Sequence, residues 1–151
     1  MPKIAGIKNR SPETYPVSKG KPALVETQSN VNTTHTVTDV ASSIVEAPIS
    51  FQAPATGSSK AIVMVSGVLS SPSAGGIDVT VNVLVDTDVP SPPGTVVVAV
   101  PVADAPVPFS LVFETTAFTS SSMQTIDVQA ATSAGTVVAG GVSFVVMVSS
   151  V

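Results

Sequence analysis

Hydrophobic and polar residues alternate with a period of two along much of the chain, as in β-strands that bury one face. The clearest stretch is 77–86. One face of this stretch would carry Ile77, Val79, Val81, Val83 and Val85, and the other Asp78, Thr80, Asn82 and Asp86. Residues 107–114 and 125–130 alternate in the same way. We therefore predict that Val79, Val81 and Val83 point into a core.

Runs of this kind predict about eight strands, at 44–52, 60–70, 76–86, 95–102, 107–115, 123–130, 135–139 and 142–150. Segments rich in Gly, Pro and Ser separate them and are read as turns, at 54–59, 71–75, 90–94, 119–122 and 140–141. No amphipathic helix pattern is evident. Short strands at regular spacing predict an all-β fold, an antiparallel sandwich or jelly roll.

The composition favours the same fold. The chain has 29 valines against four leucines, and Val packs well on a pleated sheet whereas Leu suits helices. Only 11% of the 151 residues are charged, which is well below the roughly 25% of a typical globular domain. Ser and Thr take the place of the missing charges.

The charges divide the chain into two regions. Residues 1–21 carry Glu13 and five cations, which gives +5 − 1 = +4. Residues 22–151 carry one cation and nine anions, which gives +1 − 9 = −8. The first region also holds several prolines, which favour extended backbone. We predict an extended basic arm over 1–33 and a sandwich domain over 34–151, with a solvated, disordered tail as the alternative reading of the first segment. The partner-binding residues of the arm would be Lys3, Lys8, Arg10, Lys19 and Lys21.

Two predicted strands are apolar on both faces, at 96–100 and 144–148. In a two-layer sandwich one face of each strand meets water, so a second apolar face needs another cover. The arm or a loop would be an intrachain cover. A contact between subunits is the alternative that the low charge favours, because monomers rarely expose large apolar patches. The candidate interface residues are Val97, Ala99, Val145 and Met147.

Residues that usually carry chemistry are scarce. His35 is the one histidine, there is no cysteine, and no G-x-S-x-G elbow is present, so we nominate no metal site and no catalytic triad. His35 is expected to lead into the first strand. Asp86 and Asp88 would supply few of the six to eight oxygens that Ca²⁺ takes. We therefore expect neither an enzyme nor a cofactor.

The same features bear on partners and location. A domain charge of −8 argues against nucleic acid. The N-terminus lacks the apolar core of a secretory signal. The most apolar tract, 136–148, is shorter than the roughly 20 residues of a membrane-spanning helix and is interrupted by Gly140 and Gly141. A soluble protein made in the cytoplasm is the expectation.

The basic arm Pro2 to Val31, the alternating strand Ile77 to Asp86 and the tract Ser110 to Val151 together resemble the small jelly-roll decoration (cement) proteins of tailed bacteriophages. The resemblance is one of architecture over the full length and involves no signature motif, so no functional residues can be transferred. It implies a homotrimer on the outside of the capsid. The implied partners are the major capsid protein and further copies of the chain, and the implied location is the virion.

Other functions remain as alternatives. One is the receptor- or glycan-binding tip of a phage head or tail fibre, although no repetitive shaft precedes the domain. A carbohydrate-binding module would need an aromatic platform, and the chain has no Trp and a single Tyr, Tyr15, in the arm. A hydrolase is the weakest candidate.

Overall fold

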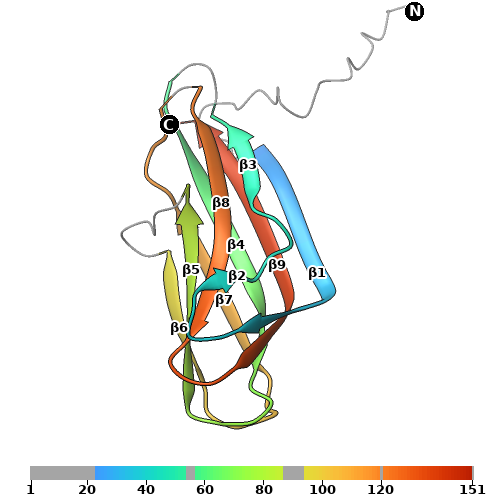
Figure 1. Cartoon of the computed structure of the whole chain (residues 1–151). Helices are drawn as coiled ribbons and strands as arrows, with labels where there is room; N and C mark the ends of the chain where they lie inside the picture. Colours follow the sequence, from blue (N-terminus) through green and yellow to red (C-terminus); the bar gives the residue numbers. More distant parts are fainter. Residues whose placement is uncertain (1–22, 54–56, 87–93, 120, 151) are drawn as a thin grey trace, which may run out of the picture.

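The protein folds as a sandwich of two antiparallel β-sheets, seen in the computed structural model of the chain (Figure 1). The structure describes residues 23–53, 57–86, 94–119 and 121–150. These residues contain nine strands and no helix. The prediction of an all-β antiparallel sandwich is confirmed.

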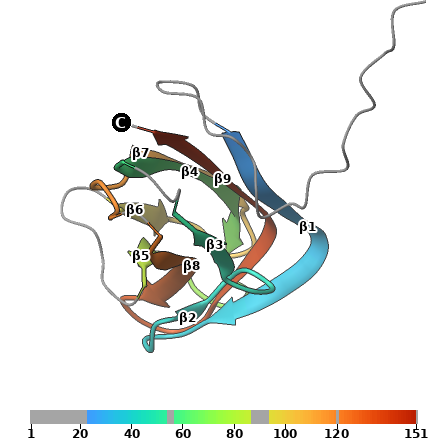
Figure 2. The same cartoon turned by 90° about the horizontal axis from the view of Figure 1, so that it is seen from above.

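The first sheet has the strand order β1-β9-β4-β7 and is called sheet A. Its strands are β1 (Ala23–Val37), β9 (Val137–Ser150), β4 (Ser59–Ser70) and β7 (Val107–Glu114). The second, sheet B, has the order β2-β8-β5-β6, and β3 pairs with β8 as well. Its strands are β2 (Ser42–Ser43), β3 (Ile49–Gln52), β8 (Met123–Thr132), β5 (Ile77–Val85) and β6 (Thr95–Val100). Figure 2 shows the two sheets as two layers.

The pairing follows a wrapped ribbon. If β2 and β3 count as one interrupted strand, the described residues form eight strands. The first of these pairs with the eighth, the second with the seventh, the third with the sixth and the fourth with the fifth. The pairs are β1 with β9, β2 and β3 with β8, β4 with β7, and β5 with β6. A double-stranded ribbon folded over in this way gives a jelly-roll-like sandwich.

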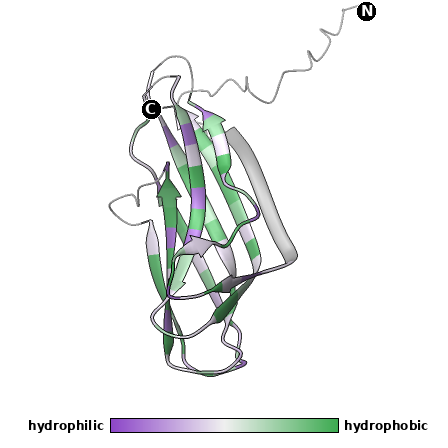
Figure 3. Ribbon diagram, in the orientation of Figure 1, coloured by the Kyte–Doolittle hydropathy of each residue, from purple (hydrophilic) through white to green (hydrophobic). Residues whose placement is uncertain are grey.

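The core lies between the sheets, and the alternation read from the sequence places the residues in it. Val79, Val81 and Val83 of β5 are fully buried, and so are Ile126 and Val128 of β8. Figure 3 shows the alternation as bands of hydrophobic and hydrophilic residues along β8. Burying a Val side chain contributes about 1.5–3 kcal/mol, so these inward faces supply much of the driving force for folding.

The predicted boundaries differ most from the structure at three places, and the other strand ends differ by one or two residues. β1 begins at Ala23, so the boundary between arm and domain that we placed after residue 33 falls inside a strand. The predicted strand 44–52 is divided into β2 and β3. The predicted strands 135–139 and 142–150 are one strand, β9.

Gly140 and Gly141, which were predicted to form a turn, form a β-bulge within β9. Between the partners Ser66 and Val68 of β4 there is one residue, whereas β9 has two between Ser143 and Gly140. Gly141 takes a φ of +58°, a left-handed conformation that costs other residues energy. An extra residue with a positive φ bends a strand without ending it. The two glycines therefore kink β9 and leave its pairing with β1 and β4 continuous on either side.

Candidate assembly surface

The outer faces of the two sheets differ in chemistry. On sheet A, register places Met64 of β4 between Val145 of β9 and Val112 of β7. In the next row, Ile62 of β4 lies beside Met147 of β9. We call these five side chains the apolar patch. Val112 is 64% exposed, and the other four are half-buried on the solvent side of the sheet.

Polar side chains border the apolar patch along the strands. One border is a row of three serines, in which Ser66 of β4 lies between Ser143 of β9 and Ser110 of β7. The other border holds an ion pair between Lys60 Nζ and Glu114 Oε1, 2.8 Å apart. An apolar centre with a polar rim is the common composition of protein interfaces.

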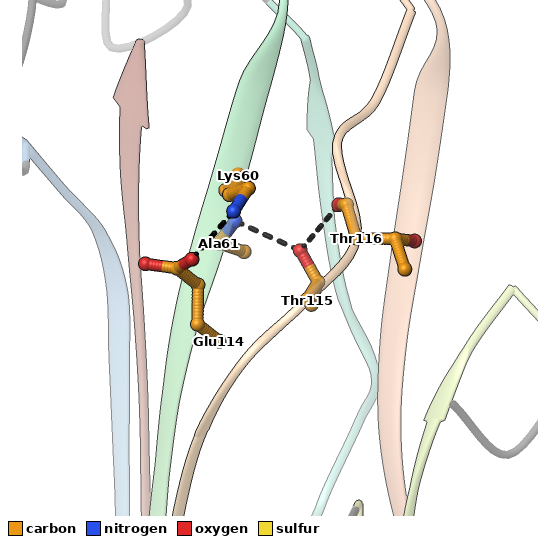
Figure 4. Close-up of polar contacts among 5 residues, drawn as sticks. All are labelled: Lys60, Ala61, Glu114, Thr115 and Thr116. Carbon is orange, nitrogen blue, oxygen red and sulfur yellow. Dashed lines mark hydrogen bonds and ion pairs between the residues drawn. The ribbon is translucent and has the colours of Figure 1, made fainter. Parts of the chain in front are cut away.

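The ion pair lies where β4 and β7 are fixed together (Figure 4). Thr115, the residue after Glu114, is buried. Its hydroxyl accepts a hydrogen bond from the backbone N–H of Ala61 at 3.0 Å and donates one to the carbonyl oxygen of Thr116 at 3.0 Å. Its own N–H donates to the Ala61 carbonyl at 2.9 Å. These bonds hold the end of β7 against β4, which keeps Glu114 within reach of Lys60.

The outer face of sheet B is polar over β8 and β5, and several of its side chains are hydrogen-bonded to one another. Asp127 of β8 accepts hydrogen bonds from the Ser43 hydroxyl at 2.8 Å and from the Gln129 amide at 3.1 Å. Across β5 and β6, the Thr95 hydroxyl donates to Asn82 Oδ1 at 2.7 Å. Several polar groups of this face are thus hydrogen-bonded within the face, and it presents carboxylates without a cation among the described residues.

The four interface residues predicted from the sequence fall on two different surfaces. Val145 and Met147 belong to the apolar patch on sheet A. Val97 and Ala99 lie on β6 in sheet B, and both are exposed, Val97 by 60%. By register Ala99 is opposite Asp78, and Val97 is opposite Thr80. The structure therefore does not bring the two pairs together.

Sequence reasoning missed three members of the apolar patch, Ile62, Met64 and Val112. The signal for two of them was present. Residues 61–65 are apolar in both phases of the alternation, which is the feature that singled out β6 and β9. Val112 lacked such a signal, because its place beside Met64 depends on the pairing of β4 with β7.

The remaining sequence candidates occupy separate places. The five arm cations, from Lys3 to Lys21, lie outside the described residues. So does Asp88. Asp86 directly follows β5, and its carboxylate accepts a hydrogen bond from the Thr125 N–H at 2.9 Å. His35 lies within β1, not before the first strand, and its Nε2 is buried without a hydrogen-bond partner in the structure.

The described residues contain neither a metal-ligating cluster nor a helix that could span a membrane. No group of three or more His, Cys, Asp and Glu residues there could hold a metal ion. In that same part of the chain there is no helix with the length and apolar character to cross a membrane. Comparisons of the chain with protein-family models, with curated proteins and with solved structures gave no match.

Proposed function

We propose that this chain is a structural virion protein, a decoration protein that binds the outer surface of a tailed-phage capsid as an oligomer and stabilises the shell. Its partners would be the major capsid protein and other copies of itself, with no catalytic activity and no cofactor. The observation that carries the proposal is that sheet A bears apolar side chains on both faces. Its inner face fills the core of the sandwich, and its outer face offers the apolar patch for a further packing partner.

The fold is consistent with this role. Jelly rolls recur in viral capsid proteins, where rigid sandwiches pack side by side. A two-sheet body with an apolar patch on one outer face and hydrogen-bonded polar side chains on the other suits a subunit that is covered on one side and meets water on the other. The basic residues before Ala23 would supply a second attachment, because the net charge of +4 over residues 1–21 complements acidic surfaces of neighbouring subunits.

The experiment is reconstitution on capsids that lack the protein. The purified chain is added to such capsids, unbound protein is removed by sedimentation, and the copies retained per particle are counted. We expect saturation at a fixed ratio to the major capsid protein, with a higher temperature of capsid disruption. Failure to bind, or binding without a plateau, would argue against the proposal.

A receptor- or glycan-binding fibre tip is the second candidate. Lectin domains also use the jelly roll, and the outer face of sheet B presents amide and carboxylate groups from Asn82, Asp127 and Gln129. These groups already bond to neighbouring side chains, which reduces what they offer to a sugar. Glycan-array binding that Asn82→Ala abolishes, together with no capsid occupancy, would favour this candidate.

A further inference from the structure

We infer that the apolar patch on the outer face of sheet A is the surface through which copies of this chain contact one another. The inference rests on the proposed function, in which the chain assembles as an oligomer, and it identifies the surface and the partner. The patch consists of Ile62, Met64, Val112, Val145 and Met147.

The charge distribution favours a second copy of the chain as the partner that covers the apolar patch. The chain from residue 22 onward carries +1 − 9 = −8, so two copies repel each other over most of their surface, and like charges brought together at an interface are costly. On the outer face of sheet A the described strand residues of β4, β7 and β9 include one cation and one anion, Lys60 and Glu114, and these form an ion pair. The part of this face formed by β4, β7 and β9 is thus neutral, and two copies can approach there without a charge penalty.

The rim is also complementary to itself. Lys60 and Glu114 have partly exposed side chains, at 34% and 52%, and lie next to the patch. When two copies bring their patches together, Lys60 of each can face Glu114 of the other. Such an exchange adds attraction between copies without leaving a charge unpaired. A partner of strongly acidic or strongly basic character would match this rim less well.

The other apolar site of the domain is less suited to contact between copies. Val97 and Ala99 lie on the edge strand β6, and register sets the exposed Asp78 opposite Ala99. No lysine or arginine among the described residues of sheet B compensates this carboxylate. Two copies that met at β6 would bring their Asp78 side chains together, whereas two copies that met at the apolar patch would not.

The structure offers a matched pair of variants for the test. Val112 on β7 and Val97 on β6 are both exposed valines, by 64% and 60%. Each lies close to an acid on the same outer face. Glu114 is two residues after Val112 on β7, and Asp78 is opposite Ala99, which is two residues after Val97 on β6. Val112→Asp and Val97→Asp therefore place the same charge in similar surroundings on opposite sheets, and neither opens a cavity in the core.

The experiment measures the oligomeric state of the full-length chain by sedimentation equilibrium, with circular dichroism as the check on folding. We expect wild type and Val97→Asp to form the same oligomer. Val112→Asp should remain folded and become a monomer at micromolar concentration. The milder Val112→Thr, which keeps the shape of the side chain, should raise the dissociation constant by about tenfold, and Val97→Thr should leave it unchanged.

Three outcomes would overturn the inference. One is a wild-type chain that is a monomer at every concentration, and another is a Val112→Thr variant that associates as tightly as wild type. The third is loss of the oligomer in the Val97 variants alone. Capsid occupancy is scored separately, so the two proposals fail separately. A wild-type monomer that still saturates capsids would overturn this inference but not the capsid binding in the proposed function. An oligomer that does not bind capsids would overturn the proposed function but not this inference.

Discussion

Lys60 and Glu114 form an ion pair that joins β4 to β7 at the border of the apolar patch, with Nζ and Oε1 2.8 Å apart. Both side chains are partly exposed, so solvent screens the pair, and exposed pairs of this kind contribute only about 0–1 kcal/mol to stability. The folding of the single chain should depend little on it. Its position on the rim of a proposed interface makes assembly the more sensitive measurement.

We predict that Lys60→Glu and Glu114→Lys each weaken the association of copies, because either change gives the rim two charges of the same sign. The double variant, Lys60→Glu with Glu114→Lys, restores opposite charges and should restore association. Sedimentation equilibrium at low ionic strength measures the three dissociation constants, and the differences should shrink as salt rises. A double variant that associated as weakly as the single ones would contradict the exchange of partners.

A second prediction concerns the register of β5. Val81 is fully buried. Asn82 is half-buried on the outer face, where its side-chain oxygen accepts a hydrogen bond from the Thr95 hydroxyl. Val81→Asp places a carboxylate in an apolar core and should cost more than about 4 kcal/mol. That is a large share of the roughly 5–15 kcal/mol that stabilises a domain. Asn82→Asp keeps the acceptor oxygen and should change stability by less than about 1 kcal/mol.

Thermal and urea unfolding of the two variants test this assignment. Val81→Asp should lower the melting temperature strongly or prevent folding, and Asn82→Asp should melt close to wild type. Equal losses from the two substitutions would mean that the faces of β5 are wrongly assigned.

Strand faces could be predicted from the sequence because alternation is a local property. The inward positions of 77–85 and 126–130 follow from period two alone, and the structure places them in the core. β1 could not be found in this way. Residues 26–36 contain one aliphatic side chain, Val31, among polar ones, and the strand is defined by its pairing with β9, which lies more than 100 residues away along the chain.

The candidate surface could be predicted only in part, because it depends on which strands are neighbours. The sequence showed that β6 and β9 have apolar residues on both faces, and from this we placed Val97 and Val145 in one interface. The ribbon topology puts β6 in sheet B and β9 in sheet A. It also places Met64 between Val112 and Val145. These three residues come from segments far apart in the sequence, so no local pattern predicts their contact.

A third prediction tests the bulge in β9. Gly141 has a φ of +58° and nothing within 4 Å of where a Cβ would lie, so Gly141→Ala should cost only the strain of the left-handed conformation. That strain is about 1–2 kcal/mol. Gly140 is the matched control, since its φ is not in the left-handed region and an added Cβ would be 3.6 Å from Thr34 Cγ2, an ordinary contact.

We therefore expect Gly140→Ala to unfold at the same urea concentration as wild type or a higher one, because it removes freedom from the unfolded chain. Gly141→Ala should unfold at a lower concentration. A Gly140→Ala variant less stable than Gly141→Ala would show that steric fit, and not backbone conformation, fixes these two glycines.

The last prediction separates the basic segment from the folded domain. Because β1 begins at Ala23, a chain that starts at Ala23 loses all five arm cations and keeps all nine strands of the described residues. We expect it to retain the circular dichroism spectrum and melting temperature of the full chain. On capsids that lack the protein it should show lower occupancy. The attachment that remains should also be less sensitive to salt, because charge attraction between the arm and an acidic surface is screened by ions.

A chain that starts at Asn32 is the matched comparison, since it removes the pairing of residues 23–30 with 142–148 of β9 as well. Each ladder hydrogen bond contributes about 1 kcal/mol net, and the loss leaves that edge of β9 unpaired. This chain should therefore melt well below the chain that starts at Ala23. If the two truncated chains have the same melting temperature, the first half of β1 contributes nothing to the stability of the fold, and the domain boundary after residue 33 is the better one. If the chain that starts at Ala23 fills capsids as the full chain does, at every salt concentration, the five cations play no part in attachment.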